Sequence, residues 1–155
     1  MKISELCKIN PSPTIVINDC EAIDYIDTSS VVNGHLESIQ HLTRDFPSRA
    51  QREVLSGDIL ISSVRPNLRH NYYVQQWDNG KVASSGFIHI RVSSPSIDSR
   101  FLYYFLTSPS QVSRYVRIAD SSQSAYPSFN KDVIEKIDFP NIDLPTQLRI
   151  AGIMA

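Results

Sequence analysis

An arginine–asparagine–arginine group occupies alternate positions directly after an apolar run of the sequence. Arg65, Asn67 and Arg69 lie in SSVRPNLR, which overlaps the end of the run ILISSV. A guanidinium group presents five donors in a planar fork that suits a phosphate or a guanine edge, and an asparagine amide suits adenine. Because the end of a buried strand projects into a loop, we expect these side chains to contact phosphates or base edges. The alternative is a Pro-Asn turn whose arginines cap carbonyl groups or pair with nearby acids.

Other polar and aromatic residues extend this set of candidates. The serines before Gly86 could offer hydroxyl and backbone N–H groups to a phosphate, or Gly86 could simply relieve crowding where a strand begins. Tyr126 precedes Pro127 and could stack on a sugar or base, or could anchor its loop by packing. The candidate nucleic-acid contacts are Arg44, Arg49, Arg52, Arg65, Asn67, Arg69, Ser84, Ser85, Arg114, Arg117, Gln123 and Tyr126.

Motifs for catalysis are missing from the sequence. It contains no G-x-S-x-G, P-loop, G-x-G-x-x-G or H-E-x-x-H pattern. Ser85 and His89 would lie about 13 Å apart in a regular strand, too far for a nucleophile and its base. A metal site needs ligands at close spacing, which the two cysteines lack; the residues considered were Cys7, Cys20, His35 and His41. We therefore expect no catalytic residues, no bound metal and no cofactor.

The charge of the chain is unevenly distributed. The 155 residues carry 15 basic and 16 acidic side chains, a net charge of −1 that excludes a histone-like polycation. Residues 38–119 nevertheless hold 10 basic and 5 acidic side chains, whereas the segments before and after are acidic. Ten of the basic residues are arginines, which favours a specific anion-binding face, although a solvated surface with ion pairs is the alternative. Without an apolar run long enough for a signal peptide or membrane span, we expect one cytoplasmic domain with reduced thiols.

Local patterns predict an α+β fold. Strands are expected at residues 14–17, 22–26, 71–77 and 81–92, and a strand, turn and strand within residues 53–64. Residues 35–47 look irregular. Helices are expected from the Asp98 cap to near Pro109, at residues 110–118 and 130–137, and from a Thr146 cap onward. This order predicts a twisted, mixed and partly barrel-like sheet with helices packed at one end.

Six phrases, in order, resemble one target-recognition domain of the DNA specificity (S) subunit of type I restriction–modification systems. They cover nearly the whole chain from Asp24 to Ala155, and GDILISSVRPN and SAYPSFN are the most specific. The phrases are YIDTSSVVNG, SRAQREVLSGDILISSVRPNLR, VASSGFIHIR, DSRFLYYFLTS, SAYPSFNKDVIEKIDFP and LPTQLRIAGIMA.

The resemblance implies a non-catalytic reader of double-stranded DNA that recognises one half of a bipartite target. It implies a recognition domain over residues 1–143 and the start of a long spacer helix over residues 144–155. Its partners would be the modification (methyltransferase) subunits and the restriction (translocase) subunit, which carry the methyl donor, ATP and Mg. Because a full S subunit has two such domains, we expect a fragment, a truncated reading frame, or a half-length subunit that forms a homodimer. The alternative is an assembly module that docks on the modification subunit without reading DNA.

Phrases that a family shares cannot select different DNA sequences, so they more plausibly build the scaffold or bind the DNA backbone. We therefore expect base readout from the remaining segments, at residues 35–46, 71–80 and 114–123.

Overall fold

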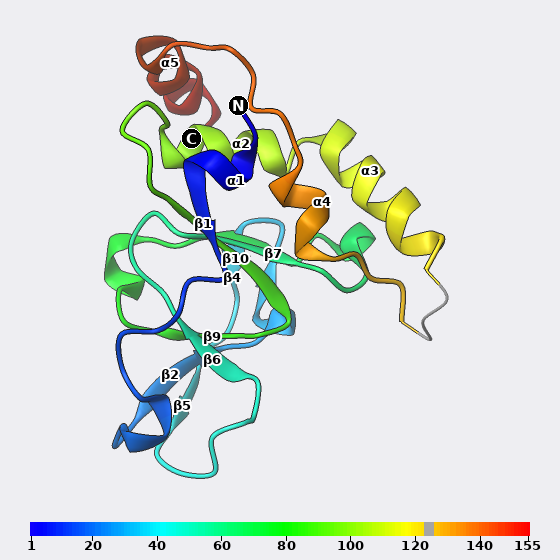
Figure 1. The fold of residues 1–155 in the computed structure, drawn as a ribbon. Coiled ribbons are helices and arrows are strands. Elements are labelled where there is room, and N and C mark those ends of the chain that lie inside the picture. Colours follow the sequence, from blue (N-terminus) through cyan, green and yellow to red (C-terminus); the bar gives the residue numbers. More distant parts are fainter. Residues whose placement is uncertain (123–125) are drawn as a thin grey trace.

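Two small four-stranded sheets and a group of helices make up the fold (Figure 1). The computed structural model describes residues 1–122 and 126–155. The first sheet is antiparallel, and its order is β1 (Cys7–Ile9), β10 (Phe87–Val92), β7 (Ile59–Ser62) and β8 (Asn71–Tyr73). The second sheet is mixed, and its order is β5 (Gln40–Leu42), β2 (Ile23–Ile26), β9 (Val82–Ser84) and β6 (Ala50–Glu53).

Shorter elements complete the chain. A two-stranded ribbon, β3 (Val31–Val32) and β4 (His35–Leu36), turns at Asn33 and Gly34, where both backbones are left-handed. The helices are α1 (Ile3–Leu6), α2 (Ser99–Leu106), α3 (Pro109–Asp120), α4 (Lys131–Glu135) and α5 (Leu144–Met154). Single 3₁₀ turns lie at η1 (Ile17–Asp19), η2 (Thr28–Ser30), η3 (Pro66–Leu68) and η4 (Gln76–Asp78).

The first sheet lies between two apolar cores because its strands alternate. Ile59 and Ile61 of β7 face the core that the helices cover, whereas Leu60 faces a second core between the sheets. β10 divides in the same way, with Ile88 on the helix side and Phe87 on the other. Both faces of these strands are therefore covered.

The helices pack at one end of the molecule, as predicted (Figure 1). Asp98 caps α2 by accepting a hydrogen bond from the Phe101 N–H at 2.8 Å. Tyr115 of α3 stacks on Phe129 with ring centroids 4.7 Å apart. The predicted Thr146 cap is wrong: Asp143 is the N-cap of α5 and accepts from the Thr146 N–H at 3.1 Å, so the helix begins earlier.

Several predicted strands differ from the structure. Residues 14–16 form no strand, because the chain passes over the surface there and then enters η1. The strand expected over residues 71–77 ends at Tyr73, and residues 35–47 contain β4 and β5. Residues 81–92 break into β9 and β10, which belong to different sheets, and β6 and β7 likewise do not pair with each other.

The α+β class and the mixed sheet are confirmed. Over the described residues the two sheets stay open, so a closed barrel is not formed. Within residues 1–122 and 126–155, no helix combines the length and apolar character needed to cross a bilayer.

Candidate nucleic-acid interface

A cleft of about 330 Å³ opens where the two sheets meet, and it collects predicted residues from distant parts of the chain. Arg49 precedes β6, Arg65 follows β7, and Tyr126 follows α3. Thr28, Val64 and Gly86 complete its lining. Two arginines and a tyrosine that are unrelated by local sequence therefore face one space.

Arg65 is held in place by its backbone and by an aromatic ring. Its N–H donates to the Pro127 carbonyl at 2.8 Å, next to an isolated bridge between Val64 and Ser128. Its guanidinium carbon lies 5.2 Å from the centroid of the Tyr126 ring. The backbone is left-handed, with φ 48° and ψ 61°, which is uncommon for a residue with a Cβ. These contacts aim a charged side chain that is otherwise exposed.

The serine–serine–glycine segment forms the corner between the sheets. The Ser85 N–H donates to the Arg49 carbonyl at 2.7 Å, and the Gly86 N–H donates to Ser84 Oγ at 3.0 Å. A Cβ on Gly86 would lie 3.0 Å from Thr28 Cγ2, so the corner requires a residue without one.

This geometry corrects two expectations. The Ser84 side chain is fully buried and its hydroxyl accepts from the Gly86 N–H, so it is not presented to DNA in this structure. The N–H groups of Ser85 and Gly86 are already bonded within the corner, so they do not form a phosphate cradle. Gly86 relieves crowding, which was the alternative interpretation. Ser85 is half-buried at the edge of the corner, and its hydroxyl remains a candidate DNA contact.

A second groove, of about 380 Å³, lies beside the first along the same loop. Asn67 and Arg69 reach it from η3, and Arg117 reaches it from α3, together with Val112, Ser113 and Val116. Arg69 also has a left-handed backbone, with φ 54°. Arg65 therefore lines the first groove, whereas Asn67 and Arg69 line the second. All three residues belong to the loop that follows β7.

The remaining predicted residues do not join these two grooves. Arg44 is exposed between β5 and β6, and Arg114 is half-buried on α3. Arg52 lines a separate cavity beside η1, where burial lowers the pKa of its guanidinium. Gln123 lies outside the described residues. Thr28 lines the cleft but was not among the residues predicted from the sequence, although it lies in the phrase YIDTSSVVNG.

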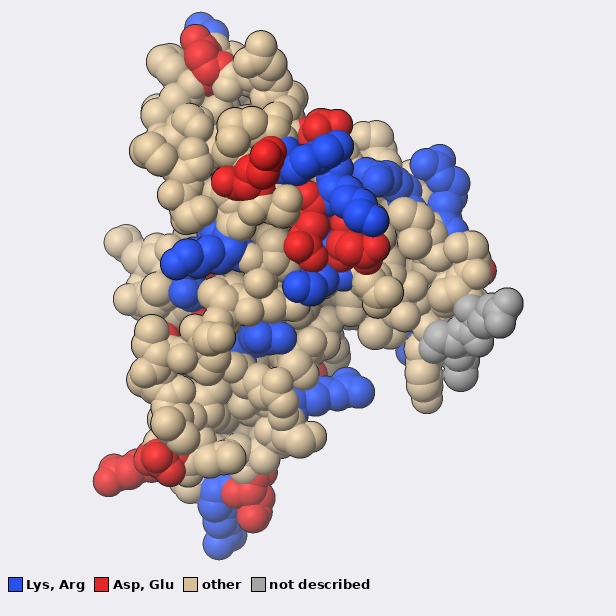
Figure 2. Space-filling model, viewed as in Figure 1, with Lys and Arg blue, Asp and Glu red and all other residues tan. Residues whose placement is uncertain are grey.

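The arginines of the two grooves are available for an external anion. Among the described residues, the ion pairs that lysine and arginine form within the chain involve Lys2, Lys81, Arg91, Lys131 and Lys136. Figure 2 shows basic side chains across the middle of the face that Figure 1 presents, with acidic side chains above them. A phosphate would therefore not have to displace an internal carboxylate from Arg49, Arg65, Arg69 or Arg117.

The buried histidine is engaged inside the protein. His89 Nε2 lies 2.6 Å from Asp58 Oδ2, and Arg91 donates to the same carboxylate through Nε at 3.0 Å and Nη2 at 2.8 Å. Burial alone would raise the pKa of Asp58, but the hydrogen bonds from His89 and Arg91 outweigh it and lower the pKa. In the part of the chain that the structure describes, no three His, Cys, Asp or Glu residues are placed to hold a metal ion.

Comparison with known proteins gives consistent matches. Residues 1–155 match the family described as type I restriction modification DNA specificity domain. The chain is 26% identical over 155 residues to the type I restriction enzyme HindI specificity subunit of Haemophilus influenzae, covering 98% of this chain and 32% of that protein.

Solved structures share the fold. The HsdS subunit from Thermoanaerobacter tengcongensis matches with a TM-score of 0.84 and 23% identity, over 99% of this chain and 40% of that one. A chain from a structural study of complex assembly and conformational transition of the type I R-M system matches with a TM-score of 0.79 and 22% identity, over 99% and 41%. The chain thus spans well under half the length of these relatives.

Proposed function

This chain belongs to the family of type I restriction modification DNA specificity domains, and from that premise we propose that it binds double-stranded DNA and reads one half of a bipartite target. The observation that carries the proposal is the convergence of Arg49, Arg65 and Tyr126 on one cleft. A family relationship alone would not say which face meets the DNA, whereas this cleft and the second groove together supply four arginines, two in each.

The chemistry of the cleft suits a phosphate. The Arg65 guanidinium carbon lies over the Tyr126 ring, 5.2 Å from its centroid, and in this proposal its N–H groups donate to a phosphate oxygen. Stacking also restricts the side chain before DNA arrives, so less rotamer freedom is lost on binding. In this proposal Arg49 and Arg65 hold the backbone, and Asn67, Arg69 and Arg117 hold a neighbouring position.

Base readout is assigned to residues 35–46, 71–80 and 114–123. Their described parts include the exposed turn around β5, the η4 turn with Trp77 69% exposed, and the last turns of α3. The exposed positions of these segments can vary without disturbing either core, whereas Tyr72, Val74 and Tyr115 within them are core residues. Exchanging these segments for those of a relative should exchange the recognised sequence.

The reactions themselves are assigned to partner subunits. In the proposed complex the modification subunits supply the methyl donor chemistry and the restriction subunit uses ATP and Mg, while this chain has no catalytic role. Residues 1–143 would form the reader and residues 144–155 the start of a spacer helix. A homodimer of this chain would supply two recognition domains, one for each half of the bipartite site.

The test is DNA binding by fluorescence anisotropy over a range of salt concentrations. We expect binding to weaken steeply with salt because phosphate contacts release counterions. Arg65→Ala should weaken binding about equally on all sequences and reduce the salt slope by about 1 if Arg65 contacts a phosphate. Arg149→Ala is the matched control, because Arg149 is an exposed arginine on α5, away from the cleft.

Other outcomes separate the alternatives. A specificity change at one base pair, without a change in slope, would reassign Arg65 to base readout. Unchanged affinity and slope for Arg65→Ala and Arg49→Ala, beside a salt-dependent wild type, would contradict the assignment of the cleft. No binding to any duplex would contradict the proposed function itself.

One observation favours a second role in assembly. α5 buries Gln147 and Ala151 against the domain but leaves Leu148 53%, Ile153 78% and Met154 56% exposed. We propose that these exposed apolar side chains dock on the modification subunit. Gel filtration with that subunit should show a complex that Leu148→Ser with Ile153→Ser abolishes, while DNA binding by the variant is retained. Complex formation without any DNA binding by the wild type would favour a pure assembly module.

A further inference from the structure

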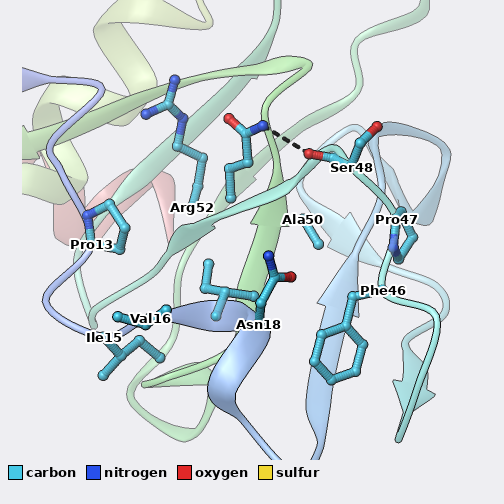
Figure 3. A pocket seen from close by; sticks show the side chains of 11 residues that line it. Pro13, Ile15, Val16, Asn18, Phe46, Pro47, Ser48, Ala50 and Arg52 are labelled. Atoms are coloured by element: carbon cyan, nitrogen blue, oxygen red, sulfur yellow. Dashed lines mark hydrogen bonds between the residues drawn. The ribbon is translucent and has the colours of Figure 1, made fainter.

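A cavity of about 630 Å³ shares no lining residue with the arginine cleft and has no role in the function proposed above. Figure 3 shows Ile15 and Val16 along one side and Phe46 and Pro47 along the other, with Asn18 between them. The cavity therefore has the form of a slot with apolar sides, one aliphatic and one aromatic, and a polar group inside.

The sides of the slot are fixed to the protein rather than loosely exposed. Phe46 packs against the core that contains Ile17, and Ile17 itself is buried. On the opposite side, Thr14 Oγ1 donates to Glu53 Oε1 of β6 at 2.8 Å, which ties residues 13–16 to the strand. Val16 still exposes 65% of its surface, and Ile15 exposes 41%. The structure thus maintains apolar surface in contact with water, which marks a binding site.

Polar groups at the slot can read a planar ligand. The Asn18 amide offers a donor and an acceptor side by side, and it makes no hydrogen bond to the other residues drawn in Figure 3. This pair of groups matches the edge of a nucleobase, above all adenine. Arg52 lies at one end of the cavity, where its Nε is buried and lacks a hydrogen-bond partner.

The turn that leads into β6 lines both the slot and the arginine cleft. Arg49 lines the cleft, whereas Ser48 and Ala50, on either side of it in sequence, line the slot. A DNA backbone held at Arg49 would therefore pass beside the opening between Ile15 and Phe46. Aromatic side chains bind unstacked bases in this way, because every base presents a flat face.

We infer that the slot between Ile15, Val16 and Phe46 binds one unstacked nucleobase, with Asn18 contacting its edge. The inference rests on the proposed function only in taking DNA as the source of the base. The cavity is larger than a single base requires, so it also accommodates the attached sugar. The apolar sides would be protected from water only while a base is bound.

The test uses the whole chain and mononucleotides as probes. Methyl NMR signals of Ile15 and Val16 report on the slot directly, because a stacked base shifts neighbouring methyl groups upfield. We expect saturable shifts with deoxyadenosine monophosphate and none with deoxyribose 5-phosphate, which has the same sugar and phosphate without the base. Asn18→Ala should weaken the response, and Phe46→Ala should weaken it by at least about 5-fold.

A control variant outside the slot and three contrary results decide whether the NMR shifts report a bound base. Leu55→Ala, at an exposed apolar residue that lines neither the slot nor the arginine cleft, should leave the shifts unchanged. Absent shifts, equal shifts with deoxyribose 5-phosphate, or shifts caused only by the modification subunit would overturn the inference. Should Phe46→Ala unfold the chain, the exposed Asn18→Ala still decides the question.

The two proposals can fail separately. Salt-dependent duplex binding that needs Arg65, without nucleotide shifts at Ile15 and Val16, would remove only the base slot. Nucleotide shifts without duplex binding would keep the slot as a nucleotide site and remove the proposed function.

Discussion

Removing the buried Asp58 carboxylate should destabilise the domain strongly. Asp58 is 2% exposed and accepts hydrogen bonds from His89, from two nitrogens of Arg91 and from the Leu55 N–H. Asp58→Ala leaves all of these donors without their acceptor, and the guanidinium is only 22% exposed. The loss of unfolding free energy comes from leaving the Arg91 cation and the other donors unpaired in the interior, rather than from the lost attraction itself.

The expected loss is about 3 kcal/mol, at the lower end of the range for breaking a buried ion pair, because Arg91 can recover some hydration. For a chain of 155 residues, each kcal/mol lowers the melting temperature by roughly 2–4 °C, so a shift of about 6–12 °C follows. Urea unfolding followed by circular dichroism would measure the loss at an unchanged m-value.

A double variant tests the reason for the loss. Asp58→Ala with Arg91→Met removes the unpaired cation, so it should be more stable than the sum of the two single losses predicts. Strict additivity would refute the reasoning, as would a loss below about 1 kcal/mol for Asp58→Ala.

The dependence on pH follows from the same carboxylate. The pKa of Asp58 is lower in the folded state than its ordinary value of 3.8. The ionised Asp58 therefore contributes fully to the free energy of unfolding at pH values above its ordinary pKa of 3.8. This contribution disappears as the pH falls through the lower pKa of the folded state. The difference in stability between wild type and Asp58→Ala should consequently narrow in acid, and a difference that widened would contradict the assignment.

Three further outcomes are expected. Gly34→Ala should lose about 1–2 kcal/mol in urea unfolding, because φ is 85° and the new Cβ would lie 3.0 Å from a tyrosine hydroxyl; equal stability would contradict this. Tyr72→Phe should lose about 1–2 kcal/mol in the same assay, since it removes one donor from the buried Asp78 carboxylate. Burial raises the pKa of Cys7 to about 12, so mass spectrometry should find iodoacetamide on Cys20 well before Cys7 in the folded chain, and equal rates would be inconsistent with the structure.

Local signals predicted the helices well. Asp98 followed by Leu102 and Leu106 indicates a cap and a buried stripe, and all of these contacts form within a few residues of one another. The α5 cap shows the limit of such signals, because Asp143 and Thr146 are both acceptable cap residues. Only the observed backbone distinguishes them.

Strand pairing was the part that local patterns could not determine. Residues 81–92 form one extended run in the sequence, yet β9 joins β2 and β6 whereas β10 joins β1 and β7. The break lies at Ser85 and Gly86, where the chain crosses from one sheet to the other. A strand propensity does not specify a partner, because its pairing energy comes from neighbours that are distant in sequence.

The candidate site divides in the same way. Arginine at 49, 65 and 69 and tyrosine at 126 could each be proposed from residue type, but sequence could not show that Ser84 is buried or that Gly86 forms a corner. The slot beside Phe46 gave no signal at all, because Ile15 and Val16 look like an ordinary strand. In the structure these two residues lie outside any strand and face water.

The sequence by itself determined the family, the α+β class and the concentration of arginine in the middle of the chain, because these depend on residue order and local periodicity. The tertiary structure decided which of those arginines line a common cleft. Arg49, Arg65 and Tyr126 meet because β6 pairs with β9 and Val64 pairs with Ser128. Such pairings are favourable only once both cores have formed, so no single segment of the sequence contains them.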